Sequence, residues 1–308
     1  MNNQNVNLNL RKKMIYKVGS NNPFVKKIQE ALGLKQDGIF GQTTAKALIA
    51  FQRENNLVAD GVAGKETIEA LGILDSDDSR NFYTVRGLVI EKHFLPKIEY
   101  VEGFDNKVFD YLFLHHTAGW DNPYNVIDGW AKDTNGRIAT EFVIGGQNIK
   151  NNTDEYDGRV VQAFPEGSYA YHLGKVGSQT MHKNSVAVEL CNFGYIQNNK
   201  TYSGTIVHKD QIVTLDKEFR GFKDWHKYSK RQIENLRKLI LYIADRNNID
   251  VRKGIVEVLK AEGIEKAFSF NPDAYNGKIK GMWLHCNVRQ DKFDMAPQPE
   301  FVNMLLNL

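Results

Sequence analysis

The sequence predicts an α/β protein with a central mixed β-sheet flanked by helices, preceded by a small all-α domain of three helices. The chain has 308 residues, more than one average domain, and 42% of them are apolar, enough for two hydrophobic cores. From residue 82 onward, strand-like runs alternate with stretches of helical period, an order typical of a sheet covered by helices. The first 74 residues carry an internal repeat and helical stripes instead.

The repeat in the first domain is the pattern Asp-Gly-x-x-Gly-x-x-Thr. It runs from Asp37 to Thr44 and again from Asp60 to Thr67, an offset of 23 residues. Each Asp-Gly is a turn signal that leads into a helical pattern. Three apolar stripes are expected to pack together: Val25, Ile28 and Leu32, then Ala47, Leu48 and Phe51, then Ile68 and Leu71.

The boundary between the domains is expected at a polar segment. Residues 75–81 (DSDDSRN) break the apolar pattern, so they are read as a linker between residues 1–74 and residues 82–308. Residues 1–13 are Asn-rich, and the pattern leaves open whether they form an edge strand or a loose arm.

The second domain contains five candidate strands and one clear helix. The strands are expected at residues 111–115, 141–144, 160–164, 185–191 and 281–285. The helix is expected at residues 230–247, where apolar residues recur at helical spacing and Lys and Arg occupy the other side. Residues 250–280 are read as an inserted helical element followed by a loop.

Composition excludes several classes of function. A net charge of +3, without a basic stripe or a recognisable motif, argues against a nucleic-acid partner. No apolar run reaches the roughly 18 residues that a membrane span needs, and the polar start lacks a secretory signal. The two cysteines, Cys191 and Cys286, are expected to be buried thiols. Residues 1–74 hold ten Lys or Arg against six Asp or Glu, which suits an anionic polymer, although solubility alone would explain it.

Side chains that can bind a metal or transfer a proton interrupt three of the apolar runs. Glu189 breaks the strand at residues 185–191, where burial would raise its pKa towards that of a useful base, and a structural ion pair is the alternative. Because adjacent strand residues point to opposite faces, the pairs His115-His116 and His285-Cys286 are each expected to supply one ligand. Asp294 lies nine residues after His285. Two imidazoles and a carboxylate suit zinc and leave a fourth position for water.

Four blocks, in this order, resemble the type 2 N-acetylmuramoyl-L-alanine amidase family, which includes phage endolysins, bacterial amidases and peptidoglycan recognition proteins. The blocks are residues 114–118 (LHHTA), 158–162 (GRVVQ) with 170–174 (AYHLG), 184–190 (NSVAVEL), and 285–294 (HCNVRQDKFD). Residues 22–74 look like the type 1 peptidoglycan-binding domain found beside many wall hydrolases.

The resemblance implies the amidase type 2 fold and zinc-dependent hydrolysis of the amide between N-acetylmuramic acid and L-alanine of the stem peptide. The implied zinc ligands are His115, His285 and Asp294. Glu189 would be the general base, and Lys292 would stabilise the oxyanion. Three further residues are expected to bind substrate or support the ligands: His172, Tyr171 and Trp120. Core packing is an equal alternative for the two aromatic residues.

Some features depart from the family pattern, and other functions remain open. Glu141 stands where many relatives have histidine, Asp294-Met295-Ala296-Pro297 replaces Asp-Pro-Gly, and the interval from Glu189 to His285 is longer than usual. The alternatives are a non-catalytic peptidoglycan-recognition protein and a zinc carboxypeptidase that acts within the stem peptide. The sequence shows no signal peptide, and its first domain resembles a wall-binding module. We therefore expect a monomeric phage endolysin that is made in the cytoplasm and acts at the bacterial cell wall.

Overall fold

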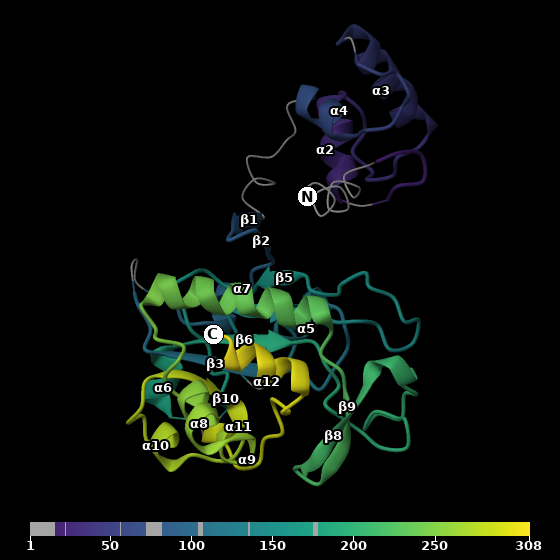
Figure 1. The fold of residues 1–308 in the computed structure, drawn as a ribbon. Coiled ribbons are helices and arrows are strands. Elements are labelled where there is room, and N and C mark those ends of the chain that lie inside the picture. Colours follow the sequence, from purple (N-terminus) through teal and green to yellow (C-terminus); the bar gives the residue numbers. More distant parts are fainter. Residues whose placement is uncertain are drawn as a thin grey trace. The chain divides into compact units, whose positions relative to one another are not determined.

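A computed structural model describes residues 16–21, 23–55, 57–71, 82–103, 107–134, 136–174 and 178–308. The chain divides into two compact units, Met1–Arg80 and Asn81–Leu308 (Figure 1). No helix within the described ranges combines the length and the apolar character that a membrane crossing requires. The linker expected at residues 75–81 and the arm at residues 1–13 lie outside the described residues.

The first unit contains the expected three helices. They are α2 (Pro23–Ala31), α3 (Gln42–Glu54) and α4 (Lys65–Ala70). Buried apolar residues from all three helices form its core, among them Val25, Leu48 and Ile68. One part of the predicted stripe on α3 is wrong, because Ala45 lies in the core while Phe51 is only partly buried. On this helix, Gln52 faces the turn of the second copy of the repeat.

A buried glutamine holds the turn in each copy of the repeat. Gln52 is hydrogen-bonded to four groups of the second turn: its Nε2 donates to Asp60 Oδ1 at 3.1 Å, Val62 O at 3.0 Å and Thr67 Oγ1 at 3.1 Å, and its Oε1 accepts from Gly61 N at 3.0 Å. Gln29 makes the same set of bonds to Asp37, Ile39, Thr44 and Gly38. The Asp and Thr of the repeat are therefore anchors of the turns, which explains why they recur together.

Replacing Gln52 by Leu should destabilise the first unit. The substitution leaves buried polar groups of the turn without partners, and one such group costs about 1–3 kcal/mol. Calorimetry of the full-length chain should show a lower melting temperature for one transition only. Gln42→Leu, at an exposed position of the same helix, is the control and should leave both transitions in place. Identical melting curves for the Gln52 variant and the parent would contradict the structural role.

The second unit is built on a central mixed sheet, as predicted, and this sheet has seven strands. The strands in spatial order are β1 (Phe82–Val85), β2 (Leu88–Lys92), β5 (Val160–Gln162), β4 (Phe142–Ile144), β6 (Ser185–Leu190), β3 (Tyr111–His116) and β10 (Gly281–Leu284). The pairs β1–β2 and β4–β5 are antiparallel, and the other pairs are parallel. All five expected strands are present, while β1 and β2 were not predicted.

Helices cover both faces of this sheet. Alternate residues of β4 enter different cores: Phe142 and Ile144 pack with α7 (Lys230–Asn247), whereas Val143 packs with α5 (Pro123–Trp130). The helix α7 has the predicted bounds and runs along the sheet (Figure 1). A capping box between Ser229 and Gln232 explains why it begins at residue 230.

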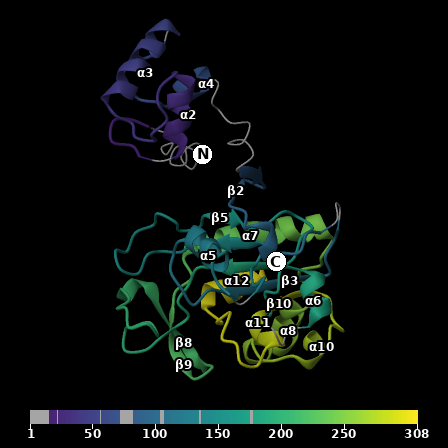
Figure 2. The same ribbon diagram turned by 180° about the vertical axis from the view of Figure 1, so that it is seen from behind.

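Two additions extend the unit beyond the sheet. A three-stranded antiparallel sheet, not predicted, is formed by β7 (Tyr195–Ile196), β9 (Phe222–His226) and β8 (Ile212–Phe219). The expected helical segment contains α8 (Ile255–Glu262), α9 (Ile264–Ala267) and α10 (Pro272–Tyr275). Figures 1 and 2 show β8 and β9 on one side of the unit and α10 with α6 (Gln179–Lys183) on the other.

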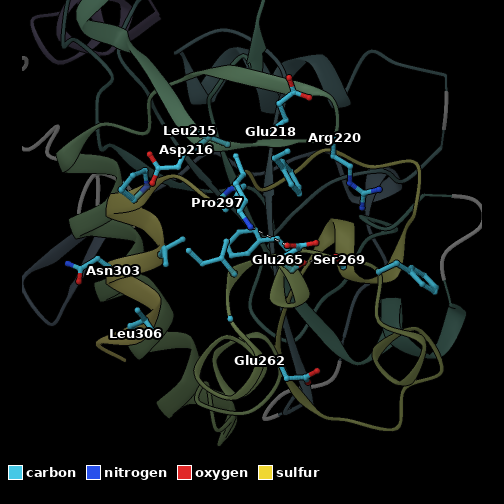
Figure 3. A pocket seen from close by; sticks show the side chains of 18 residues that line it. Leu215, Asp216, Glu218, Arg220, Glu262, Glu265, Ser269, Pro297, Asn303 and Leu306 are labelled. Carbon is cyan, nitrogen blue, oxygen red and sulfur yellow. Dashed lines mark hydrogen bonds and ion pairs between the residues drawn. The ribbon is translucent and has the colours of Figure 1, made fainter.

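Strand β8, the segment of α8 and α9, and the C-terminal helix α12 (Pro299–Leu306) line an open pocket of about 1260 Å³. Its walls include Leu215 of β8, Glu265 of α9 and Leu306 of α12 (Figure 3). None of the predicted site residues lines it. The predicted site residues therefore lie elsewhere, at the edge of the seven-stranded sheet.

The departure at Glu141 has a structural explanation. The buried carboxylate accepts two hydrogen bonds of 2.8 Å from the guanidinium of Arg246 on α7, and a third of 3.0 Å from Gln162 on β5. Because every oxygen is paired, Glu141 ties α7 to the sheet and is not part of the predicted site.

Candidate active site

Three neighbouring parallel strands bring the predicted residues to one edge of the sheet. Strands β6, β3 and β10 run in the same direction, so their carboxyl ends meet at that edge. His115 lies opposite Glu189 in the register of β3 and β6, which places both side chains on the same face. His285 is the first residue after β10.

His115, His285 and Asp294 form a tight triangle of possible metal ligands. Nδ1 of His115 lies 3.0 Å from Nδ1 of His285, and Oδ2 of Asp294 lies 3.3 Å and 3.0 Å from these two nitrogens. All three side chains are buried. Atoms bound at about 2.0–2.1 Å to a tetrahedral zinc ion lie roughly 3.3 Å from one another, so the triangle fits such an ion.

The protonation states also suit a metal ion. Burial and the neighbouring His285 lower the pKa of His115 to about 4, which keeps its imidazole neutral at pH 7. Burial by itself would raise the pKa of Asp294, but the two histidines hold it well below its usual range. A neutral imidazole with a free lone pair and an ionised carboxylate are the forms that zinc binds.

The outer side of His115 is fixed by a chain of hydrogen bonds. Its Nε2 lies 3.0 Å from Nδ1 of His172, and Nε2 of His172 lies 2.6 Å from Oγ of Ser185. When Nδ1 of His115 keeps its lone pair for a metal, its Nε2–H donates to His172, whose own N–H donates to Ser185. Such partners orient a ligating imidazole. His172 is buried, and its contact with His115 favours the supporting role over direct binding of substrate.

Glu189 lies beside the triangle as an isolated carboxylate. Its side chain makes no hydrogen bond or ion pair to a described residue. Burial and the charge of Asp294 raise its pKa well above the usual range, and the cation of Lys292 opposes this shift. A carboxylate without a structural partner and with a raised pKa has the properties of a general base.

Lys292 belongs to a loop that other contacts hold in place. Arg289 binds Asp291 through two hydrogen bonds of 2.8 and 2.6 Å and donates to Leu173 O at 2.6 Å, next to His172. The backbone N–H of Lys292 donates to Arg289 O at 3.3 Å. The loop thus holds Lys292, a half-buried residue whose positive charge lowers the pKa of Glu189.

Comparisons with known proteins identify the family of the chain. Residues 105–291 match the family model described as N-acetylmuramoyl-L-alanine amidase. The chain belongs to this amidase family. Residues 21–71 match the model described as putative peptidoglycan binding domain. No curated protein matches the chain.

Solved structures of low similarity include several amidases. The N-acetylmuramoyl-L-alanine amidase LysC from Clostridium intestinale URNW is 14% identical, with 71% of this chain and 98% of that chain covered and a TM-score of 0.36. For AmiD from E. coli, in complex with the substrate anhydro-N-acetylmuramic acid-L-Ala-D-gamma-Glu-L-Lys, the identity is 16%, the coverage 56% and 55%, and the TM-score 0.30.

One prediction about the candidate ligands is wrong. We expected His285 and Cys286 to point to opposite faces of a strand, but β10 ends at Leu284 and α11 (His285–Val288) begins there. His285 still reaches the triangle, while the thiol of Cys286 is buried against Phe268 O at 3.7 Å. His116 points away from the triangle, and its Nδ1 lies 2.9 Å from the hydroxyl of Tyr228.

The two aromatic candidates, Tyr171 and Trp120, pack against residues outside the triangle. The ring of Tyr171 packs edge-on against His182 at 5.1 Å and Tyr169 at 6.1 Å. Trp120 follows β3 and is 39% exposed. Its ring is covered by Nζ of Lys150 at 4.8 Å and touches Phe193 edge-on at 5.0 Å. Neither ring contacts a residue of the triangle among these ring contacts.

Proposed function

We propose that the chain is a zinc-dependent peptidoglycan hydrolase that cleaves the amide between N-acetylmuramic acid and L-alanine of the stem peptide. One observation carries the proposal: the His115–His285–Asp294 triangle has the spacing of zinc ligands and lies next to Glu189, a half-buried carboxylate with no hydrogen-bond or ion-pair partner among the described residues. When bound there, zinc supplies Lewis acidity that lowers the pKa of water and polarises the scissile carbonyl.

The residues around the triangle have separate roles in the proposed reaction. Glu189 accepts a proton from the attacking water and later delivers it to the leaving amine of L-alanine. Lys292 donates a hydrogen bond to the developing oxyanion, a contribution worth about 3 kcal/mol when a single donor is lost. His172 and Ser185 act through His115 by holding its ring in one orientation and tautomer.

Two other functions are compatible with parts of the site. A peptidoglycan-recognition protein would use the same fold without catalysis, but it would not need a carboxylate of raised pKa beside the triangle. A zinc carboxypeptidase would use similar ligands to release the terminal residue of the stem peptide.

Mass spectrometry of digested peptidoglycan tests the three functions together. The proposed amidase should produce a free amino group on L-alanine and a free lactyl carboxylate on muramic acid. Release of a single C-terminal amino acid would show a carboxypeptidase. An intact polymer after incubation with the zinc-loaded protein would leave only the recognition function.

We further propose that the first unit holds the enzyme on the wall, as expected of a phage endolysin. Its own core and the match of residues 21–71 to a peptidoglycan-binding model support this role. A tether of this kind raises the local substrate concentration and does not touch the scissile bond.

Deletion of residues 1–74 should therefore separate two activities. Cleavage of a small soluble muropeptide should stay nearly unchanged, while digestion of whole walls should fall, most strongly at low enzyme concentration. The isolated first unit should sediment with purified walls even without zinc. Equal wall digestion by both forms at every concentration, with no co-sedimentation, would contradict the tether.

A further inference from the structure

Asp294 lies in a segment whose backbone is tied to other elements on both sides. The backbone N–H of Cys286, the residue after His285, donates to the carbonyl of Asp294 at 2.9 Å. Two residues after Asp294, the backbone N–H of Ala296 donates to the hydroxyl of Tyr228 at 3.1 Å. Tyr228 lies between β9 and α7, far from Asp294 in the sequence. The backbone around Asp294 is therefore fixed by contacts outside its own loop.

The hydroxyl of Tyr228 also reaches the strand that carries His115. It lies 2.9 Å from Nδ1 of His116, the next residue on β3. Because a backbone N–H can only donate, the hydroxyl accepts from Ala296, and its own hydrogen is directed to His116. Burial raises the pKa of Tyr228 well above its usual range, the bond from Ala296 opposes this shift, and the charge of Asp294 adds to it. The hydroxyl therefore keeps its hydrogen at neutral pH and makes both bonds.

The residues that follow the two histidines of the triangle are both connected to the segment of Asp294. Cys286, which follows one histidine, binds the carbonyl of Asp294 directly. His116, which follows the other, reaches the segment through the hydroxyl of Tyr228. These connections fix the backbone of Asp294 relative to both imidazoles.

Tyr228 is itself held in one place. Its backbone N–H donates to Oε1 of Gln298 at 2.8 Å, and Nε2 of this glutamine donates to the carbonyl of His226 at 2.8 Å. Gln298 directly precedes α12, and the buried ring of Tyr228 packs edge-on against Phe301 of that helix at 5.8 Å. A hydroxyl on a ring that packing holds in this way can position a neighbouring segment.

We propose that Tyr228 is a positioning residue for Asp294, an inference that rests on the proposed function. Its hydroxyl holds the segment after Asp294 against β3 and thereby keeps the carboxylate beside the two imidazoles. A metal ligand that is held in place before the ion binds loses less conformational freedom on binding, so the affinity is higher. Residues that orient metal ligands typically contribute roughly 10- to 100-fold in metal affinity.

The alternative is a purely structural role, because a buried tyrosine hydroxyl usually has a hydrogen-bond partner. Tyr111 allows the two roles to be separated. It is also buried, it lies at the start of the strand that carries His115, and its hydroxyl donates to the carbonyl of Gly277 at 3.0 Å. Tyr111→Phe therefore removes a comparable bond that does not involve the segment of Asp294, and it is the matched control.

Zinc affinity of the full-length protein, measured by competition with a chelator at a temperature where all variants are folded, tests the proposal without requiring turnover. Tyr228→Phe keeps the ring and removes only the hydroxyl, so zinc affinity should fall about tenfold. Tyr111→Phe should lower the melting temperature but bind zinc like the parent. Unchanged zinc affinity in Tyr228→Phe, or an equal loss in Tyr111→Phe, would overturn the proposal.

Hydrogen exchange of the parent protein decides the matter if Tyr228→Phe does not fold. By linkage, a bond that favours zinc binding is itself strengthened when zinc binds. The amide of Ala296 should therefore exchange about tenfold more slowly in the zinc-loaded protein than in the metal-free protein. The amide of Gly61, which is bound to Gln52 in the first unit, should exchange at one rate in both forms. An Ala296 amide that does not respond to zinc would contradict the role of Tyr228.

These results remain separate from the test of the proposed function. A parent protein whose zinc affinity depends on the Tyr228 hydroxyl, but which leaves peptidoglycan intact, would refute the hydrolysis and keep the positioning role. Cleavage at the expected amide by a Tyr228→Phe protein with parental zinc affinity would refute only the positioning role. A parent protein that binds no zinc would refute both.

Discussion

Replacement of Glu189 by Gln should lower peptidoglycan hydrolysis by roughly 10²- to 10⁴-fold, the usual contribution of a general base. The amide has nearly the same shape as the carboxylate but cannot accept a proton at neutral pH. The triangle does not include Glu189, so zinc content should stay at the level of the parent. The experiment compares initial rates on soluble muropeptide, together with zinc per protein by mass spectrometry.

The melting temperature of Glu189→Gln provides a second test. Burial raises the pKa of Glu189, so its ionised form is disfavoured in the folded protein relative to the unfolded chain. The raised pKa costs folding free energy at every pH above the ordinary value of a glutamate. Glu189→Gln should therefore melt at the same temperature as the parent or higher at pH 7. If Glu189 instead formed a structural ion pair, the variant would be less stable than the parent. Near-normal turnover by a variant that still binds zinc would exclude Glu189 as the general base.

Replacement of Asp294 by Ala should remove the metal. Two imidazoles would remain in the triangle, without the carboxylate charge that lies 3.0 Å from His285 Nδ1. Zinc affinity should fall by more than the roughly 10- to 100-fold that loss of a merely supporting residue costs. After dialysis against a weak chelator, the variant should contain little zinc and show no hydrolysis.

Asp291→Ala is the matched control for Asp294. It removes a carboxylate from the same loop, but Asp291 is exposed and binds Arg289, not the triangle. This variant should retain zinc. Stoichiometric zinc in Asp294→Ala would show that another side chain completes the site. His172, which contacts His115, and His116, its neighbour in the chain, would then be the first to test.

Local sequence patterns did not predict the hydrogen bonds of the two buried glutamines, Gln29 and Gln52. The Asp-Gly repeat predicted turns and helices in the first unit, because such signals depend on neighbouring residues. The partners of Gln52 lie eight to fifteen residues further along the chain, so no periodicity points to them. The sequence did contain one indication of these bonds. Gln29 and Gln52 are polar residues on apolar helix faces, and they are separated by the same 23 residues as the two turns.

What the sequence alone determined is the fold class, the five strands near the site, the helix α7 and the identity of the residues that meet at the sheet edge. Apolar periodicity and the order of the four blocks contain that information. The tertiary structure alone decided the 3.0 Å approach of His115 to His285, the support of His115 by His172 and Ser185, and the pairing of Glu141 with Arg246. It also placed the unpredicted strands β7 and β9 beside Phe293. The physical reason is that strand register and helix docking bring together side chains far apart in the chain, and no local pattern encodes their distance.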